Sequence, residues 1–190
     1  MLLSRSISLI FSDNGLQVFD VEELPTHGGS LRVFAQNCNT GIQSVSNRVI
    51  ELRKREVESG MNTAEFYKDF QTKADKVKND LLRFLIKAKQ NGKNIASYGA
   101  AAKGNTLFNY AGIKSDLIPF VCDIAPSKQG KFLPGSHIPI LDPEVILVEK
   151  PDFVIISPWN IASEVISQHS YIRDWGGKFV LIIPKIQIIV

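Results

Sequence analysis

The last hundred residues alternate between short, wholly apolar runs and segments with helical spacing of their apolar positions. The apolar runs are predicted strands and span residues 95–98, 118–122, 153–156 and 179–183. Helices are predicted from about Lys103 to Gly112, from Asp142-Pro143-Glu144 onward, and from about Ile161 to Trp175. Strands that are short and apolar on both faces, with helices between them, indicate a parallel sheet covered on both sides. The sequence therefore predicts an α/β domain with an open parallel sheet over residues 94–190.

Residues 37–93 show helical spacing throughout. One helix is predicted up to Gly60, with Val45, Val49 and Leu52 on one face. A longer helix is predicted from Asn62, which stands three residues before Glu65 in a capping-box arrangement. Its apolar stripe is predicted to be core or domain-packing surface and consists of Phe66, Phe70, Ala74, Val77, Leu81, Leu85 and Ala88. This region is interpreted as a helical connector that packs on the C-terminal domain.

Residues 1–36 are predicted to form a helix over residues 7–12 and a hairpin of two strands, over residues 16–21 and 31–36. Such a hairpin with one short helix buries too little surface to stand alone. It must therefore pack on the rest of the chain, or on a partner that has been cut away. Unpaired strand edges seek partners, so a homodimer through the hairpin is one possibility.

Composition excludes several classes of protein. The chain has 190 residues, 44% of them hydrophobic, and a net charge of +3. Basic residues do not interleave with aromatic ones, which argues against nucleic acid as a partner. No apolar run reaches the length of a membrane span, and two cysteines without motif spacing fit a reducing cytoplasm. The three histidines are too scattered to predict a metal site.

The segment Asn94–Gly112 contains the clearest candidate for binding chemistry. A strand ends at Gly99, three alanines follow, and a helix opens at Lys103-Gly104. Free N–H groups and the helix dipole at such a turn favour anions. Neither the P-loop order nor the three glycines of the dinucleotide fingerprint are present. Spacing alone leaves phosphate binding and an ordinary packing turn as equal alternatives.

Every polar cluster of this domain falls at the carboxyl end of a predicted strand. These clusters span residues 99–105, 123–137 and 157–160. Ligands of open α/β sheets bind at that edge. We find no order of Ser, His and Asp residues that suits a hydrolase.

Four segments resemble, in this order, the S-adenosylmethionine (SAM)-dependent sugar C-methyltransferases: THGGSLRVF, SYGAAAKGNTLFNYAGI, DIAPSKQGKFLPGSHIPI and SPWN. The resemblance implies a small zinc-binding domain, a methyltransferase domain that binds SAM, and a C-terminal Rossmann-like domain. It further implies that residues 1–36 are the end of the methyltransferase domain and that residues 94–190 are the complete Rossmann-like domain. The zinc and SAM sites would then precede residue 1, so no cofactor is expected in this chain, which is predicted to be inactive alone.

The resemblance also implies roles for individual residues. The substrate would be a nucleotide-linked deoxy-keto-sugar, with a diphosphate or sugar cradle at the turn and Lys103 as its leading charge. His27, in the HGGS turn, would be a sugar-side residue and is the candidate catalytic residue. The predicted substrate-binding residues are Tyr98, Gly99, Ala100, Ala101, Lys103, Gly104, Asn105, Thr106, Asp123, Lys128, Gln129, His137, Trp159 and Asn160.

Two other functions stay open at this point. One is a freestanding Rossmann-like ligand-binding or assembly module without catalysis. The other is a small NAD(P)-dependent oxidoreductase, which the missing third glycine disfavours and for which Asp123 is the one residue able to bind ribose.

Overall fold

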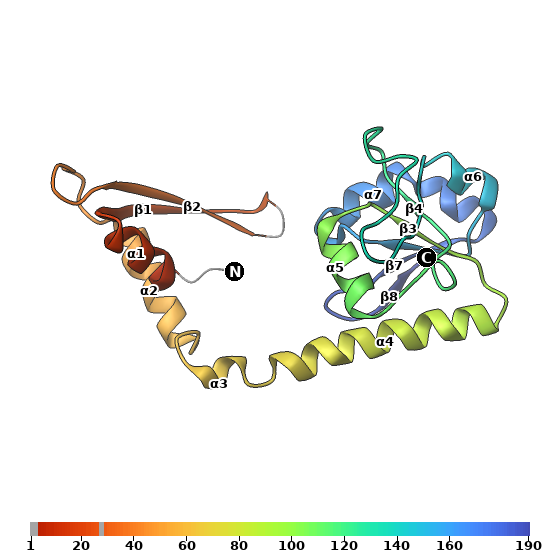
Figure 1. Ribbon diagram of the computed structural model, residues 1–190, viewed down its shortest axis with the longest axis horizontal. Coiled ribbons are helices and arrows are strands. Elements are labelled where there is room, and N and C mark those ends of the chain that lie inside the picture. The colour runs from red at the N-terminus through yellow and green to blue at the C-terminus, as the bar shows by residue number, and fades with distance from the viewer. Residues whose placement is uncertain (1–3, 27–28) are drawn as a thin grey trace. The chain divides into compact units, whose positions relative to one another are not determined.

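The computed structural model describes residues 4–26 and 29–190 (Figure 1). The chain divides into two compact units, the first ending at Gln71 and the second beginning at Thr72. The first unit contains helix α1 (Ser4–Asp13), strands β1 (Leu16–Leu24) and β2 (Ser30–Asn37), and helices α2 (Asn47–Glu58) and α3 (Ala64–Tyr67). The second contains nearly all of helix α4 (Phe70–Gln90) and the large sheet. The sequence-based bounds at residues 36 and 93 stay a prediction.

The first unit is built on the predicted hairpin. Strands β1 and β2 pair antiparallel from Leu16↔Asn37 to Leu24↔Ser30, with a bulge between Val18 and Asp20. Its small core joins Val18 and Val21 of β1 to Val49 and Leu52 of α2. In the described part of the chain, the two strands form a sheet of their own and pair with no other strand.

The prediction of one long helix from Asn62 is wrong over the first third of its length. Thr63, not Asn62, caps α3 and accepts a hydrogen bond from the Phe66 N–H at 3.4 Å. Residues 68 and 69 then interrupt the helix before α4 begins. Phe66 packs edge-on against Tyr67, and the Tyr67 hydroxyl donates to the Met61 carbonyl, so local contacts hold this turn. Only the later part of the predicted stripe is core, since Leu81, Leu85 and Ala88 are buried.

The second unit contains a six-stranded sheet in the order β5-β4-β3-β6-β7-β8. Its strands are β3 (Ile95–Tyr98), β4 (Val121–Cys122), β5 (Ile140–Leu141), β6 (Phe153–Ile156), β7 (Lys178–Leu181) and β8 (Gln187–Ile189). The first five are parallel and β8 is antiparallel to β7. Counted along the chain this is the order 3-2-1-4-5-6 of the Rossmann fold. The predicted α/β class with a mostly parallel sheet is confirmed.

Helices cover both faces of this sheet (Figure 1). Helices α4 and α5 (Ala102–Tyr110) contribute Leu85 and Phe108 to a core that includes Ile155 and Val180 of the sheet. Helices α6 (Val145–Glu149) and α7 (Ala162–Gln168) contribute Ile146 and Val165 to the core of the opposite face. Successive strand residues alternate between the two cores, as the pleat of a strand requires.

The sheet differs from the sequence prediction mainly at its short elements. Strand β4 has two residues rather than five. Residues 118–120 precede it without regular structure, and Pro119 lacks the N–H that a strand would need there. Strands β5 and β8 were not predicted, since two or three residues carry no readable periodicity. The helix predicted over residues 161–175 is divided into η2 (Trp159–Ile161), α7 and η3 (Ser170–Trp175).

Helix α5 approaches strand β6 closely at Gly104. A Cβ atom at this position would lie 2.6 Å from the Ser157 Cβ and 2.7 Å from its Oγ. Gly99, with a φ of +89°, makes the preceding turn, and a Cβ there would lie 2.5 Å from the Pro158 Cδ. These two glycines let the first turn of α5 lie directly over the end of β6.

No helix in the described residues is both long enough and apolar enough to cross a membrane.

Helix α4 offers a test of which of its apolar residues hold the domain together. Leu85 is 0% exposed and the adjacent Ile86 is 46% exposed. We expect Leu85→Ala to lower the free energy of unfolding by about 2–5 kcal/mol, because it leaves a cavity in the core. Ile86→Ala should change it by about 0.5 kcal/mol or less. Urea denaturation of both variants measures this, and equal losses would contradict the placement of α4.

The contact at Gly104 predicts a reversal of the usual helix preference. Alanine is favoured over glycine in helices by about 1 kcal/mol, yet Gly104→Ala should destabilise the domain by about 1–3 kcal/mol through overpacking. Removing the opposing side chain with Ser157→Gly in the same protein should recover part of that loss. Thermal melts of the single and double variants measure it, and a stabilised Gly104→Ala variant would contradict the close approach.

Candidate functional site

The candidate site lies at the carboxyl ends of β3 and β6, the two adjacent strands at the centre of the sheet. From β3 the chain continues through α5 to β4 on one side, and from β6 it continues through α7 to β7 on the other. The two connections diverge at this point, and open α/β sheets bind ligands at such a topological switch point. Gly99 follows β3 and Ser157 follows β6 at this edge.

Helix α5 begins at this edge without a side-chain cap. Its N-cap residue is Ala101, whose backbone is extended and whose methyl group cannot accept a hydrogen bond. Helix starts leave several N–H groups without intrahelical acceptors, and a capping side chain normally satisfies one of them. An uncapped start with a positive dipole end is therefore suited to an anionic ligand.

Lys103 and Trp159 lie close together at this edge of the sheet. The Lys103 ammonium nitrogen lies 5.8 Å from the centroid of the Trp159 ring, which belongs to η2. The structure thus brings together two residues that the sequence placed in separate polar clusters. Asn160 is the next residue of η2 and is partly exposed. A cation beside an aromatic face provides both a charge for a phosphate and a flat surface for a ring.

The backbone of Ala100 is held by an ion pair. Its N–H donates to Asp123 Oδ2 at 2.7 Å, and its carbonyl accepts from the Lys128 ammonium at 3.2 Å. The same ammonium donates to Asp123 Oδ2 at 2.9 Å. Burial alone would raise the pKa of Asp123, but hydrogen bonds from Lys128 and from two backbone N–H groups outweigh it and hold the pKa below its ordinary value. Asp123 is therefore a carboxylate at neutral pH.

A groove of about 450 Å³ lies between this turn and the loop after β4. The turn contributes Ala100, Ala101 and Ala102, and α5 contributes Asn105. The loop contributes Lys128, Lys131 and the exposed ring of Phe132. Its volume falls within the range of small-ligand sites.

The other predicted site residues have mainly internal contacts. The Thr106 hydroxyl donates to the Ala102 carbonyl at 2.9 Å, and the Gln129 amide donates to the Asp123 carbonyl at 3.0 Å. Tyr98 is buried on the face of the sheet opposite α5. His137 is exposed, with a φ of 57°. His27 lies outside the described residues.

One polar cluster was missed by sequence reasoning. His169 is buried at the end of α7, its ring centroid lies 4.4 Å from that of Tyr98, and its Nδ1 lies 2.8 Å from the Tyr171 hydroxyl. Burial lowers the pKa of His169, so its neutral form is favoured. No local motif marks these residues, because they meet only through the packing of α7 and η3 on the sheet.

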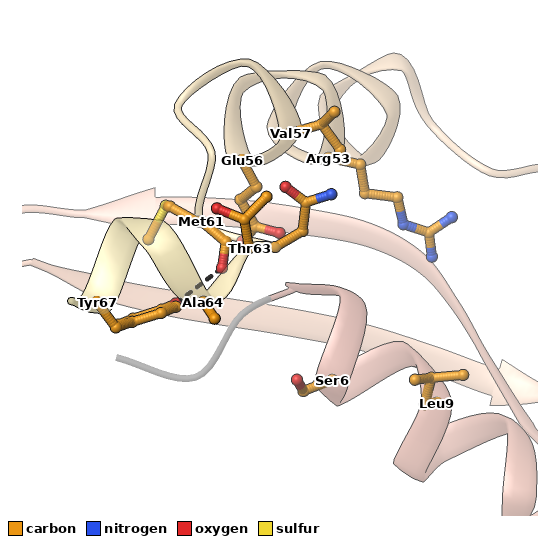
Figure 2. Close-up of a pocket in the computed structure, with 10 residues that line it drawn as sticks. Ser6, Leu9, Arg53, Glu56, Val57, Met61, Thr63, Ala64 and Tyr67 are labelled. Carbon is orange, nitrogen blue, oxygen red and sulfur yellow. Dashed lines mark hydrogen bonds between the residues drawn. The ribbon is translucent and has the colours of Figure 1, made fainter.

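The first unit has a groove of its own, of about 530 Å³, between α1, α2 and α3 (Figure 2). Leu9, Val57 and the Tyr67 ring form much of its wall, and the Arg53 guanidinium at its border donates to the Ser8 hydroxyl. Its lining is mainly apolar and includes no nucleophile paired with a base. We assign no chemistry to it.

Among residues 4–26 and 29–190, no group of three or more His, Cys, Asp or Glu side chains is arranged to hold a metal ion.

Comparison with known proteins identifies the family. Residues 25–184 match the C-methyltransferase C-terminal domain family. The chain is also 33% identical over 184 residues to a C-methyltransferase, NovU, from Streptomyces niveus. That alignment covers 97% of this chain and 44% of the relative, so the chain spans less than half of the relative's length. The family match includes the uncapped turn, the Asp123 loop and the Trp159 segment, and the chain belongs to the C-methyltransferase family, whose C-terminal domain it contains.

Proposed function

We propose that this domain binds a nucleotide-linked deoxy-keto-sugar and positions it for SAM-dependent C-methylation. The observation that carries the proposal is the uncapped start of α5 at the switch point, with Lys103 beside it and Trp159 opposite. A nucleoside diphosphate has the charge and size for this edge and the adjoining 450 Å³ groove. The family match makes the methylation of a carbon atom the reaction that such binding would serve.

The chemistry of C-methylation explains why a separate binding domain is useful. In such a reaction a base would take a proton from the carbon next to the ketone, and SAM would supply the methyl group that this carbon gains, its sulfonium sulfur becoming a neutral thioether. The reacting carbon must therefore be held close to the methyl donor, and such positioning supplies a large part of many rate enhancements. A diphosphate remote from that carbon provides binding energy that can be used for orientation.

Individual residues would divide this task. The N–H groups of the first turn of α5 and the Lys103 ammonium would bind the diphosphate oxygens. The Trp159 ring, close to Lys103, would contact a ring of the ligand. Asn105, which lines the groove, would donate from its amide nitrogen to a polar group of the nucleoside.

The cofactor itself does not fit this edge. SAM carries a sulfonium cation, and Lys103 with the positive end of α5 would repel it. The Asp123 carboxylate, which contacts the turn at Ala100, already accepts hydrogen bonds from Ala100, Ala125 and Lys128. The described residues of this edge therefore favour the anionic substrate over the methyl donor. The same occupied carboxylate, together with Ala101 at the middle position of the glycine fingerprint, weighs against a nicotinamide-dependent oxidoreductase.

Lys103 provides the test of this proposal. Replacing it with alanine should weaken binding of uridine or thymidine diphosphate by about ten- to a hundredfold, because one charge-assisted hydrogen bond is lost. Lys87→Ala, an exposed substitution in α4 with the same change in charge, should leave the affinity within about twofold. Calorimetric titration measures both.

Thermal melts of the two variants serve as the control for folding. Equal affinities of wild type and Lys103→Ala would leave the turn as a packing feature. Failure of the wild-type chain to bind either nucleotide would also contradict the proposal.

A further inference from the structure

We infer that Asp123 and Lys128 act as a positioning pair that sets the shape of the anion-binding turn through the backbone of Ala100, rather than by contact with the ligand. This inference rests on the proposed function, because it concerns the same site. It assigns to Asp123 and Lys128 a role that differs from the direct substrate binding expected from the sequence.

The geometry forms a closed ring of hydrogen bonds. Asp123 Oδ2 accepts from both the Ala100 N–H and the Lys128 ammonium, and that ammonium in turn donates to the Ala100 carbonyl. Both polar groups of Ala100 are therefore bound by one ion pair. Residues 99–101 belong to no helix or strand, so no regular backbone ladder would replace these bonds.

The ion pair is itself held by its surroundings. Asp123 is 6% exposed, directly follows β4, and its Oδ1 accepts from the Ala125 N–H at 2.9 Å. The Gly99 N–H donates to the Cys122 carbonyl, which brings the end of β3 beside Asp123. Because Asp123 is anchored to the sheet, it transmits the position of β4 to the turn. Ala101, the N-cap of α5, immediately follows the clamped residue.

The charges in this arrangement have opposite direct effects on an anionic ligand. A carboxylate beside a diphosphate site repels the ligand, so its removal would strengthen binding if charge alone decided the affinity. A positioning role predicts the reverse, because the N–H groups of α5 would lose their fixed direction. The direction of the change in affinity on removal of the Asp123 carboxylate therefore distinguishes a positioning role from a purely electrostatic effect.

Lys128 and Lys87 provide a comparison at equal charge. Lys128 donates to Asp123 and Ala100, whereas Lys87 is an exposed residue of α4 that does not line the groove. Lys128→Met keeps the apolar stem and removes the ammonium, and Lys87→Met removes an equal charge. Lys128→Arg keeps a donor that can serve both Asp123 and Ala100.

The experiment is calorimetric titration of the 190-residue chain with uridine and thymidine diphosphate. We expect Lys128→Met and Asp123→Asn each to weaken binding by about tenfold, and Lys87→Met to change it by about twofold or less. Lys128→Arg should retain most of the affinity. The double variant Asp123→Asn with Lys128→Met should bind about as weakly as the weaker single variant, since coupled residues are not additive.

Three outcomes would overturn the inference while leaving the proposed function intact: tighter binding by Asp123→Asn, equal losses for Lys128→Met and Lys87→Met, or additive losses in the double variant. If Asp123→Asn fails to melt cooperatively, the comparison of Lys128→Met, Lys128→Arg and Lys87→Met decides the matter. Absence of binding by the wild-type chain would instead remove the proposed function, and the inference with it.

Discussion

The close approach of helix α5 to strand β6 is the constraint on which the candidate site depends. It requires a residue without a side chain at Gly104, where a Cβ atom would lie 2.6 Å from that of Ser157. Ser157 is in turn fixed by its hydroxyl, 2.8 Å from the Ser97 hydroxyl on β3. The helix start, the central strand and the β6 loop are therefore held together by contacts of a few atoms. A bulkier residue at this point would move the first turn of α5 away from Trp159.

The sequence predicted the parts of the fold that carry long or strongly apolar patterns. The central strands β3 and β6 were found at their true bounds, because four successive buried residues in β3 and three in β6 leave a clear signal. Thr63 was overlooked as a cap, since Asn62 and Glu65 matched the expected spacing one residue too early. The edge strands β5 and β8 depend on pairing with their neighbours, which no local pattern contains.

The sequence predicted which residues lie at the candidate site, but not which of them contact one another. Reading polar residues at the carboxyl ends of strands located Lys103, Asp123 and Trp159, because parallel strands end at one edge. It could not show that Asp123 and Lys128 bind the Ala100 backbone, since that arrangement depends on the path of the loop after β4. Nor could it join His169 to Tyr98, which are 71 positions apart and meet through packing alone.

The connection between β4 and β5 contains no helix, although the other parallel crossovers in this sheet contain one. Residues 123–139 cross the same face as α5 and bury only Leu133 and Ile138 in its core. A helix in that place would need a full apolar stripe, and most of its residues would be committed to packing. An irregular crossover commits few side chains to the core, so residues of this loop that only line the groove, such as Phe132, can change without disturbing the layers. Ligand preference in this domain can thus evolve by substitutions within one surface loop while Asp123, Lys128 and the sheet stay the same.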